Sequence, residues 1–145
     1  MSGGGVGVHA RVTGETLDLD ALARRVGRPG AGAVVTFSGT TREVERLHYE
    51  AYVEMAQARM EAILADCVAR HGLEAAAGEH RVGSVPLGEA SVIVAVSAAH
   101  RAEAFAGARE AIDRIKAEAP IWKREVRAGG EERWVAGSPV RPPSA

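Results

Sequence analysis

Residues 92–126, VIVAVSAAHRAEAFAGAREAIDRIKAEAPIWKREV, predict a strand, a helix and a second strand in direct succession. The first eight of these residues are the most apolar segment of the chain, and eight residues are too few to span a bilayer. In the helix that follows, Phe105, Ala108 and Ile112 recur at helical spacing and predict an apolar stripe. This strand–helix–strand succession is the starting point for the prediction of the whole fold.

The break between the helix and the second strand is set by Pro120. Proline disfavours helical geometry at the residue before it, Ala119, so the chain must turn soon after Lys116. On the strand that follows, Trp122 and Lys123 point to opposite sides because strand side chains alternate. If Trp122 packs on the core, Lys123 faces either a cleft or bulk water.

Outward from this segment, helical and alternating patterns occur in turn, which predicts an α+β fold whose strands need not all be parallel. The pattern predicts strands at 6–12, 33–42 (a buried strand) and 47–53, two strands within 80–99 joined around Pro86 to Gly88, and a last strand from 121 that pairs with 132–136. It predicts further helices at 17–27 and 54–72. In the helix at 54–72 one side is formed by Met55, Ala58, Ala62, Cys67 and either Ile63 or Leu64.

Length and composition indicate one globular domain over residues 1–136, followed by a proline-rich, flexible tail at 137–145. Basic and acidic residues nearly balance, leaving a net charge of -1, which argues against extensive nucleic-acid binding. The N-terminus lacks the pattern of a secretory signal, so we expect a cytoplasmic protein.

Cys67 is the only cysteine, and it is predicted to be a core thiol rather than a nucleophile. The histidines lack the spacing of metal ligands, so no metal site is expected.

Cationic residues gather at the predicted ends of elements. Lys116 falls in the same angular sector as the apolar stripe, and Arg101 falls there at the other end of the helix. Lys116 either reaches a pocket or extends to solvent at the helix end. His100 and Arg101 either form a phosphate-binding site at the helix N-terminus, or are a capping histidine and a solvent-exposed arginine. Arg42 closes the segment FSGTTR in a loop.

Four ordered blocks resemble the family of large, catalytic subunits of molybdopterin synthase over about residues 32–135. They are FSGTTR, LHYEAYVEMA, HRVGSVPLGEASVIVAVSAAHRAEAF and AIDRIKAEAPIWKRE. The resemblance implies an α/β hammerhead-like fold with additional antiparallel strands. It implies an enzyme of molybdenum-cofactor biosynthesis, a sulfurtransferase that converts cyclic pyranopterin monophosphate to molybdopterin. The sulfur donor would be the C-terminal Gly-Gly thiocarboxylate of a small ubiquitin-like carrier, in a heterotetramer built on a dimer of large subunits.

The resemblance also implies a set of substrate-binding residues, with Lys116 as the principal catalytic group and Lys123 assisting. We expect all of them to converge on one anionic pocket, with no cofactor. The implied positions are Thr40, Thr41, Arg42, His100, Arg101, Lys116, Lys123, Arg124 and Glu125. Because Lys116 would be partly desolvated and close to other cations, its pKa is predicted to be lowered.

The chain departs from the family in two places. Only EVERLH separates Arg42 from Tyr49, where the family carries a longer, glycine-containing hairpin. Family members can place an arginine from the C-terminal region in the partner's site; the matching position here is Ser138, and Arg141 is a candidate to replace that arginine. A non-catalytic phosphate-binding or scaffold module of the same fold is the alternative function.

Overall fold

The computed structural model describes residues 7–137 and 142–144. Within them, helices and strands alternate in the mixed order that the sequence predicts, and the α+β fold class is confirmed. The elements are β1 (Val8–Thr13), α1 (Leu19–Arg25), β2 (Ala33–Thr40), β3 (Arg46–Ala51), α2 (Val53–His71), β4 (Ala75–Arg81), β5 (Gly83–Pro86), β6 (Ala90–Ala98), α3 (Arg101–Glu118), β7 (Ile121–Val126) and β8 (Glu132–Gly137). None of the helices in the described residues is both long enough and apolar enough to cross a membrane.

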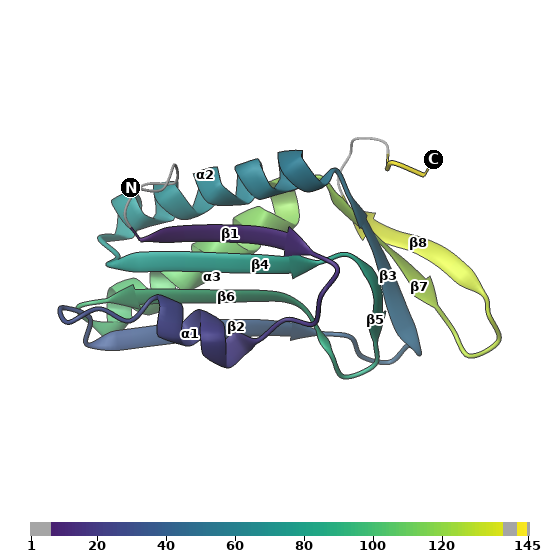
Figure 1. Ribbon diagram of the computed structural model, residues 1–145, viewed down its shortest axis with the longest axis horizontal. Helices are drawn as coiled ribbons and strands as arrows, with labels where there is room; N and C mark the ends of the chain where they lie inside the picture. Colours follow the sequence, from purple (N-terminus) through teal and green to yellow (C-terminus); the bar gives the residue numbers. More distant parts are fainter. Residues whose placement is uncertain (1–6, 138–141, 145) are drawn as a thin grey trace.

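The strands form two sheets of four strands each. The first has the order β1-β4-β6-β2, with β1 and β4 parallel and the other pairs antiparallel. The second has the order β5-β3-β7-β8 and is antiparallel throughout. Figure 1 shows α2 and α3 on one face of the first sheet, α1 on its other face, and the second sheet at one end of the molecule. These are the additional antiparallel strands that the resemblance implies.

The apolar segment at 92–99 lies in β6, a central strand covered on both faces. Val92, Val94 and Val96 pack in the core under α2 and α3, whereas Ile93 and Ala95 pack in the core under α1. Because successive strand residues point to opposite faces, a strand covered on both sides is apolar at most positions. Its two buried serines are hydrogen-bonded, since Ser91 donates to the Gly39 carbonyl and Ser97 donates to the Val26 carbonyl.

The predicted buried face of α2 is wrong at three positions. Met55, with 59% of its surface exposed, and Ala58 and Ala62 face solvent. The helix instead buries five residues at steps of three and four: Ala56, Met60, Ile63, Leu64 and Cys67. This stripe is rotated about 100° from the predicted one, which is the angle between neighbouring helical residues.

The predicted apolar stripe of α3 is wrong at Phe105, which is 63% exposed. The face that α3 buries consists mainly of small residues, including Ala104, Gly107 and Ala111. A Cβ atom at Gly107 would lie 2.8 Å from the side chain of Leu73, so a larger residue here would force that side chain to shift. The small residues bring α3 close to its neighbours and leave no room for a phenyl ring.

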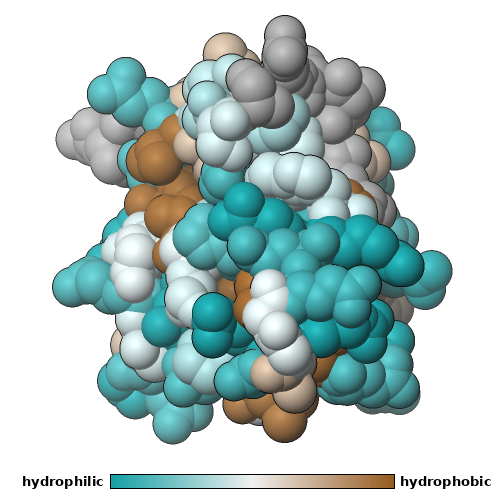
Figure 2. All heavy atoms as spheres, turned by 90° about the vertical axis from the view of Figure 1, so that its right-hand side faces the viewer, coloured by the Kyte–Doolittle hydropathy of each residue, from teal (hydrophilic) through white to brown (hydrophobic). Residues whose placement is uncertain are grey.

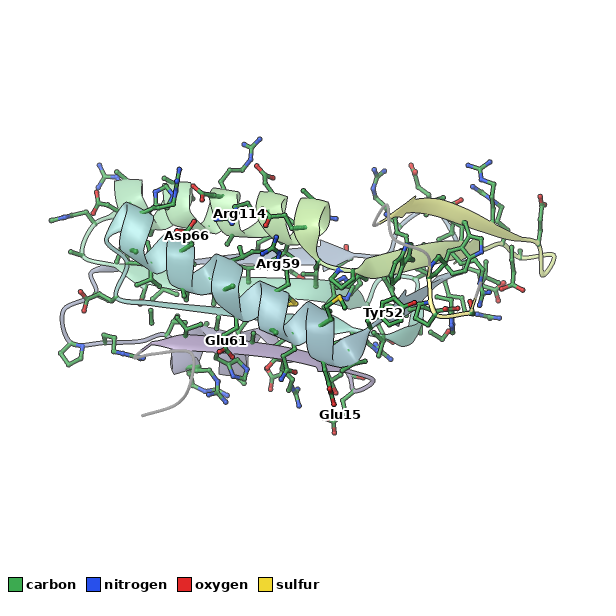
Figure 3. The ribbon with its side chains drawn as sticks, turned by 90° about the horizontal axis from the view of Figure 1, so that it is seen from above. Glu15, Tyr52, Arg59, Glu61, Asp66 and Arg114 are labelled. Atoms are coloured by element: carbon green, nitrogen blue, oxygen red, sulfur yellow. The ribbon has the colours of Figure 1, made fainter. Side chains whose placement is uncertain are left out.

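Ion pairs join α2 to α3 along their exposed sides, which lie next to each other in Figure 3. Arg114 bonds Asp66 on α2, and the Arg114 guanidinium also bonds Glu118 at 2.8 Å. Glu110 bonds His71 at 2.9 Å, and this hydrogen bond is the main reason that the pKa of Glu110 lies below its usual value. Of these contacts, Arg114–Asp66 and Glu110–His71 link the two helices, whereas Arg114–Glu118 lies within α3.

Two regions of predicted strand, at 33–42 and at 80–99, differ from the structure. Among the described residues β2 pairs only with β6, so it is an edge strand whose residues alternate in burial rather than a buried strand. The segment at 80–99 contains parts of three strands, because the chain turns at Gly83, whose φ of 87° favours glycine, and passes from the first sheet to the second. The predicted pairing of the last two strands is confirmed. Val6 and most of the tail at 137–145 lie outside the described residues, and the domain boundary at 136 stays a prediction.

Candidate functional site

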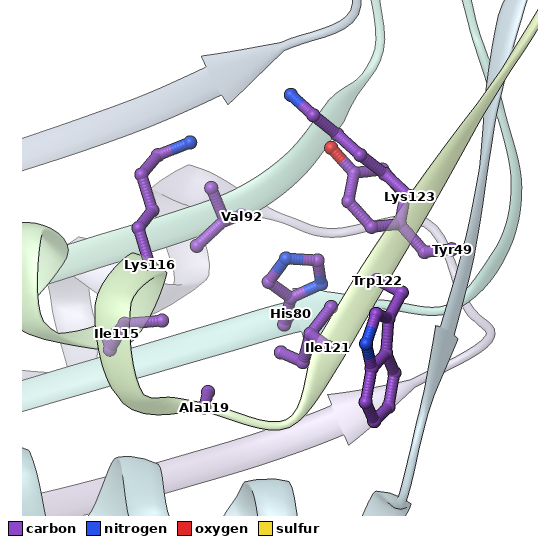
Figure 4. A pocket seen from close by; sticks show the side chains of 9 residues that line it. All are labelled: Tyr49, His80, Val92, Ile115, Lys116, Ala119, Ile121, Trp122 and Lys123. Atoms are coloured by element: carbon purple, nitrogen blue, oxygen red, sulfur yellow. The ribbon is translucent and has the colours of Figure 1, made fainter. Parts of the chain in front are cut away.

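A pocket of about 190 Å³ lies where the two sheets meet the C-terminal end of α3. Five elements contribute to it, and Figure 4 shows the side chains that surround it. The lining residues are Tyr49, His80, Val92, Ile115, Lys116, Ala119, Ile121, Trp122 and Lys123. The pocket therefore depends on how both sheets and the helix pack together.

The turn at Pro120 brings the two lysines to this pocket. Lys116 lies in the last turn of α3, and Ala119 leaves helical geometry with a ψ of 137°, as expected before proline. The chain then enters β7, where Lys123 pairs with Tyr49 of β3. Figure 4 shows both lysine side chains directed to the same side of the pocket.

The charge of Lys116 is destabilised in this setting. Burial lowers its pKa, and the nearby positive charge of Lys123 lowers it further. Lys116 is nevertheless an exposed residue by its accessible surface, so its desolvation is partial. An anion bound between the two lysines would relieve their repulsion. The lowered pKa agrees with the prediction from sequence.

Tyr49 and His80 form a buried wall of the pocket. Their rings meet edge to face with centroids 4.9 Å apart. The Tyr49 hydroxyl donates to the Ser91 hydroxyl at 3.0 Å, and burial raises the pKa of Tyr49. Burial lowers the pKa of His80 to about 4, with smaller contributions from the charges of Lys116 and Lys123. The sequence patterns do not identify Tyr49 or His80 as pocket residues. The one available signal is that His80 is a polar residue near the end of a strand that starts with apolar residues.

His100 and Arg101 do not reach this pocket within one chain. Arg101 begins α3, whereas Lys116 lies fifteen residues later, about 22 Å along the helix axis. Both His100 and Arg101 are exposed, and His100 lies 3.6 Å from Glu103 on the first turn. The expectation that one chain gathers all the implied cations in one pocket is therefore wrong for this pair. Arg101 and Lys116 were expected to meet because they lie in the same angular sector of the helix, but a shared sector does not shorten the distance between the two ends of the helix.

The end of β2 lies beside the pocket. Gly39 pairs with Val92, which lines it. Thr40 is exposed, whereas Thr41 is buried and its hydroxyl donates to the Val85 carbonyl at 3.4 Å. In the next loop Arg42 projects into solvent and pairs with its neighbour Glu43 at 3.2 Å.

Arg124 and Glu125 follow Lys123 on β7 without lining the pocket. Arg124 pairs with Glu132 at 3.0 Å and lies over the ring of Trp134, and Glu125 pairs with Arg127. Figure 2 shows that this end of the molecule carries mainly hydrophilic side chains with smaller hydrophobic areas. Ser138 and Arg141 lie outside the described residues.

Cys67 is confirmed as a core thiol. It is fully buried, and burial is the main cause that raises its pKa to about 11. A thiol with such a pKa is almost entirely protonated at neutral pH and is a poor nucleophile. Among residues 7–137 and 142–144, no group of three or more His, Cys, Asp or Glu side chains is placed to hold a metal ion.

The fold and the site define a small α+β protein with a two-lysine pocket suited to an anion. Residues 12–118 match the family model described as MoaE protein, and the chain belongs to this family. It is 49% identical to the molybdopterin synthase catalytic subunit of Oryza sativa subsp. indica over 79% of this chain and 63% of that protein. It is 39% identical to the molybdopterin synthase catalytic subunit of Thermoplasma volcanium, over 89% of this chain and 98% of that one.

The solved structures agree with the sequence relatives. A crystal structure of molybdopterin synthase from Staphylococcus aureus superposes with a TM-score of 0.82 and 30% identity, covering 87% of this chain and 96% of that chain. The chain spans somewhat less than two thirds of the length of the rice relatives that it matches. The family predicted from the four sequence blocks is therefore confirmed.

Proposed function

We propose that this chain is the catalytic subunit of a molybdopterin synthase. It would transfer sulfur from the thiocarboxylated C-terminus of a small ubiquitin-like carrier to cyclic pyranopterin monophosphate and so form the dithiolene of molybdopterin. The observation that carries this proposal is the convergence of Lys116 and Lys123 on one pocket in a member of the MoaE family. A cytoplasmic location accords with this role.

The residue types suit the chemistry. A thiocarboxylate is already a sulfur nucleophile, so the protein needs no catalytic cysteine, and the buried thiol of Cys67 has no part in the reaction. Ammonium groups stabilise both the anionic donor and the negative charge that develops on a departing oxygen. Lys116, with its lowered pKa, is suited to give a proton to that oxygen, and Lys123 assists by its charge.

The remaining substrate-binding residues fit this function if two copies of the chain form each site. Thr40 and the β7 pair Arg124 and Glu125 lie on strands that adjoin the pocket, and Arg42 lies in the loop just after β2. His100 and Arg101 lie at the far end of α3, so we propose that they serve the pocket of a second copy. The assembly would be a central dimer of this chain with one carrier at each end, and Thr41 would position the loop that carries Arg42.

Reconstitution tests the function directly. The chain is mixed with thiocarboxylated carrier and cyclic pyranopterin monophosphate, and molybdopterin is measured over time. We expect turnover by the unaltered chain and a loss of at least about a hundredfold in Lys116→Ala, since removal of one transition-state charge contact has effects of this order. Folded protein that binds carrier and substrate without forming product would instead indicate a non-catalytic module.

A further inference from the structure

His80 differs from the two lysines of the pocket because its ring can accept a hydrogen bond, whereas their ammonium groups can only donate one. It lies on β4, is 7% exposed, and lines the pocket together with Lys116 and Lys123. In Figure 4 one nitrogen of its ring is directed into the space below the two lysine ammonium groups. Packing of the Tyr49 ring against the imidazole holds it in this orientation.

The hydrogen bond on the other ring nitrogen fixes the tautomer. Nδ1 lies 2.8 Å from the carbonyl oxygen of Arg81. A carbonyl oxygen can only accept, so Nδ1 carries the proton and donates it. The buried ring is neutral at physiological pH, because its pKa is about 4. Nε2 therefore presents a lone pair to the pocket.

We propose that His80 is a specificity-determining residue, whose Nε2 accepts a hydrogen bond from an N–H group of the ligand while the lysines bind its anionic part. The lysine ammonium groups are donors only, and the hydroxyl of Tyr49 gives its proton to Ser91. A ligand with only acceptor atoms gains nothing from a lone pair at this position. A pterin phosphate has both an anionic group and a ring edge with N–H donors, so this assignment rests on the proposed function and specifies how that substrate is oriented.

Two substitutions separate this role from a structural one. In His80→Asn the amide nitrogen can take the place of Nδ1 and keep the bond to Arg81, but no atom reaches the position of Nε2. In His80→Gln the amide reaches the position of Nε2 and can offer its oxygen to the ligand, but the bond to Arg81 is lost. Both variants remove the ring that packs on Tyr49, so each is the matched control of the other.

Binding of cyclic pyranopterin monophosphate to the full chain is measured by calorimetry, with thermal unfolding as the check on folding. We expect His80→Asn to bind about tenfold more weakly than the unaltered chain and His80→Gln to stay within about threefold, since one hydrogen bond between ligand and protein contributes effects of this size. The opposite order would show that the bond to Arg81 alone matters and would overturn the proposal. Unchanged binding by His80→Asn would overturn it as well.

Sulfate provides the second arm, because it is an anion without a hydrogen-bond donor. Its binding, followed by NMR titration, is expected to be the same in both His80 variants and to be lost in Lys116→Met. A sulfate affinity that falls in His80→Asn would contradict the assignment by showing a general disturbance of the pocket. If the unaltered chain bound sulfate but not the pterin phosphate, the proposed function itself would fail. Pterin phosphate binding that His80→Asn leaves intact would refute only the role of His80.

Discussion

The separation of Arg101 from Lys116 along α3 leads to a prediction about how many chains build one site. The two residues lie about 22 Å apart along the helix axis, and helical side chains project sideways from that axis, so they do not close this distance. If both residues act on one substrate, they must come from different copies of the chain. A dimer built from Arg101→Ala in one copy and Lys116→Ala in the other would then keep one intact site of two.

The expected activity follows from counting sites. Each variant alone is predicted to be nearly inactive, whereas the mixed dimer should form molybdopterin at about half the rate of the unaltered dimer, because a symmetric dimer has two equivalent sites. Two affinity tags on co-expressed chains, used in succession, isolate the mixed dimer. Molybdopterin formation with thiocarboxylated carrier is then measured per mole of dimer.

A second mixed dimer serves as the control. Lys116 and Lys123 line the same pocket of one chain, so a dimer of Lys116→Ala with Lys123→Ala has one damaged residue in each pocket and should not recover. Equal activity of the two mixed dimers would refute the reasoning. Full turnover by Arg101→Ala on its own would refute a role for Arg101 in the site.

Three further predictions follow from the charges and the packing. Lys123→Gln removes a positive charge that lowers the pKa of Lys116, so a pH profile of anion binding should move to higher pH, and an unmoved profile would show that the two charges are not coupled. Met60→Ala in the core should reduce the free energy of unfolding by about 2–5 kcal/mol, whereas Met55→Ala on the exposed side of α2 should change it by less than about 0.5 kcal/mol, as measured by urea denaturation. Glu110 has a lower pKa in the fold than in the unfolded chain, so it stabilises the fold above its unfolded pKa and this contribution is lost as the pH falls through its folded pKa. Thermal unfolding between pH 6 and pH 3 should therefore show a smaller acid-induced loss of stability in Glu110→Gln than in the unaltered chain.

Repeating local patterns determined the elements of this fold. The apolar segment at 92–99, the glycine after α2 and the proline after α3 each mark a boundary through local sterics or periodicity, and the structure has elements that end close to these points. The same patterns predict that β7 pairs with the last strand, whereas the family was identified from the resemblance of four sequence blocks to its members. Local patterns are less able to say which residues of a helix are buried, because a helix can turn about its axis by one residue and still present an apolar stripe, as the positions of Met55 and Phe105 show.

The sequence by itself determined that two lysines flank Pro120 and that cations lie at the ends of α3. Only the tertiary structure decided which of them share a pocket. Lys116 and Lys123 come together because a turn reverses the chain between them, whereas Arg101 is kept away by the length of a rigid helix. Tyr49 and His80 join the lysines because two sheets meet there, and contacts between distant strands have no local signature in a single sequence.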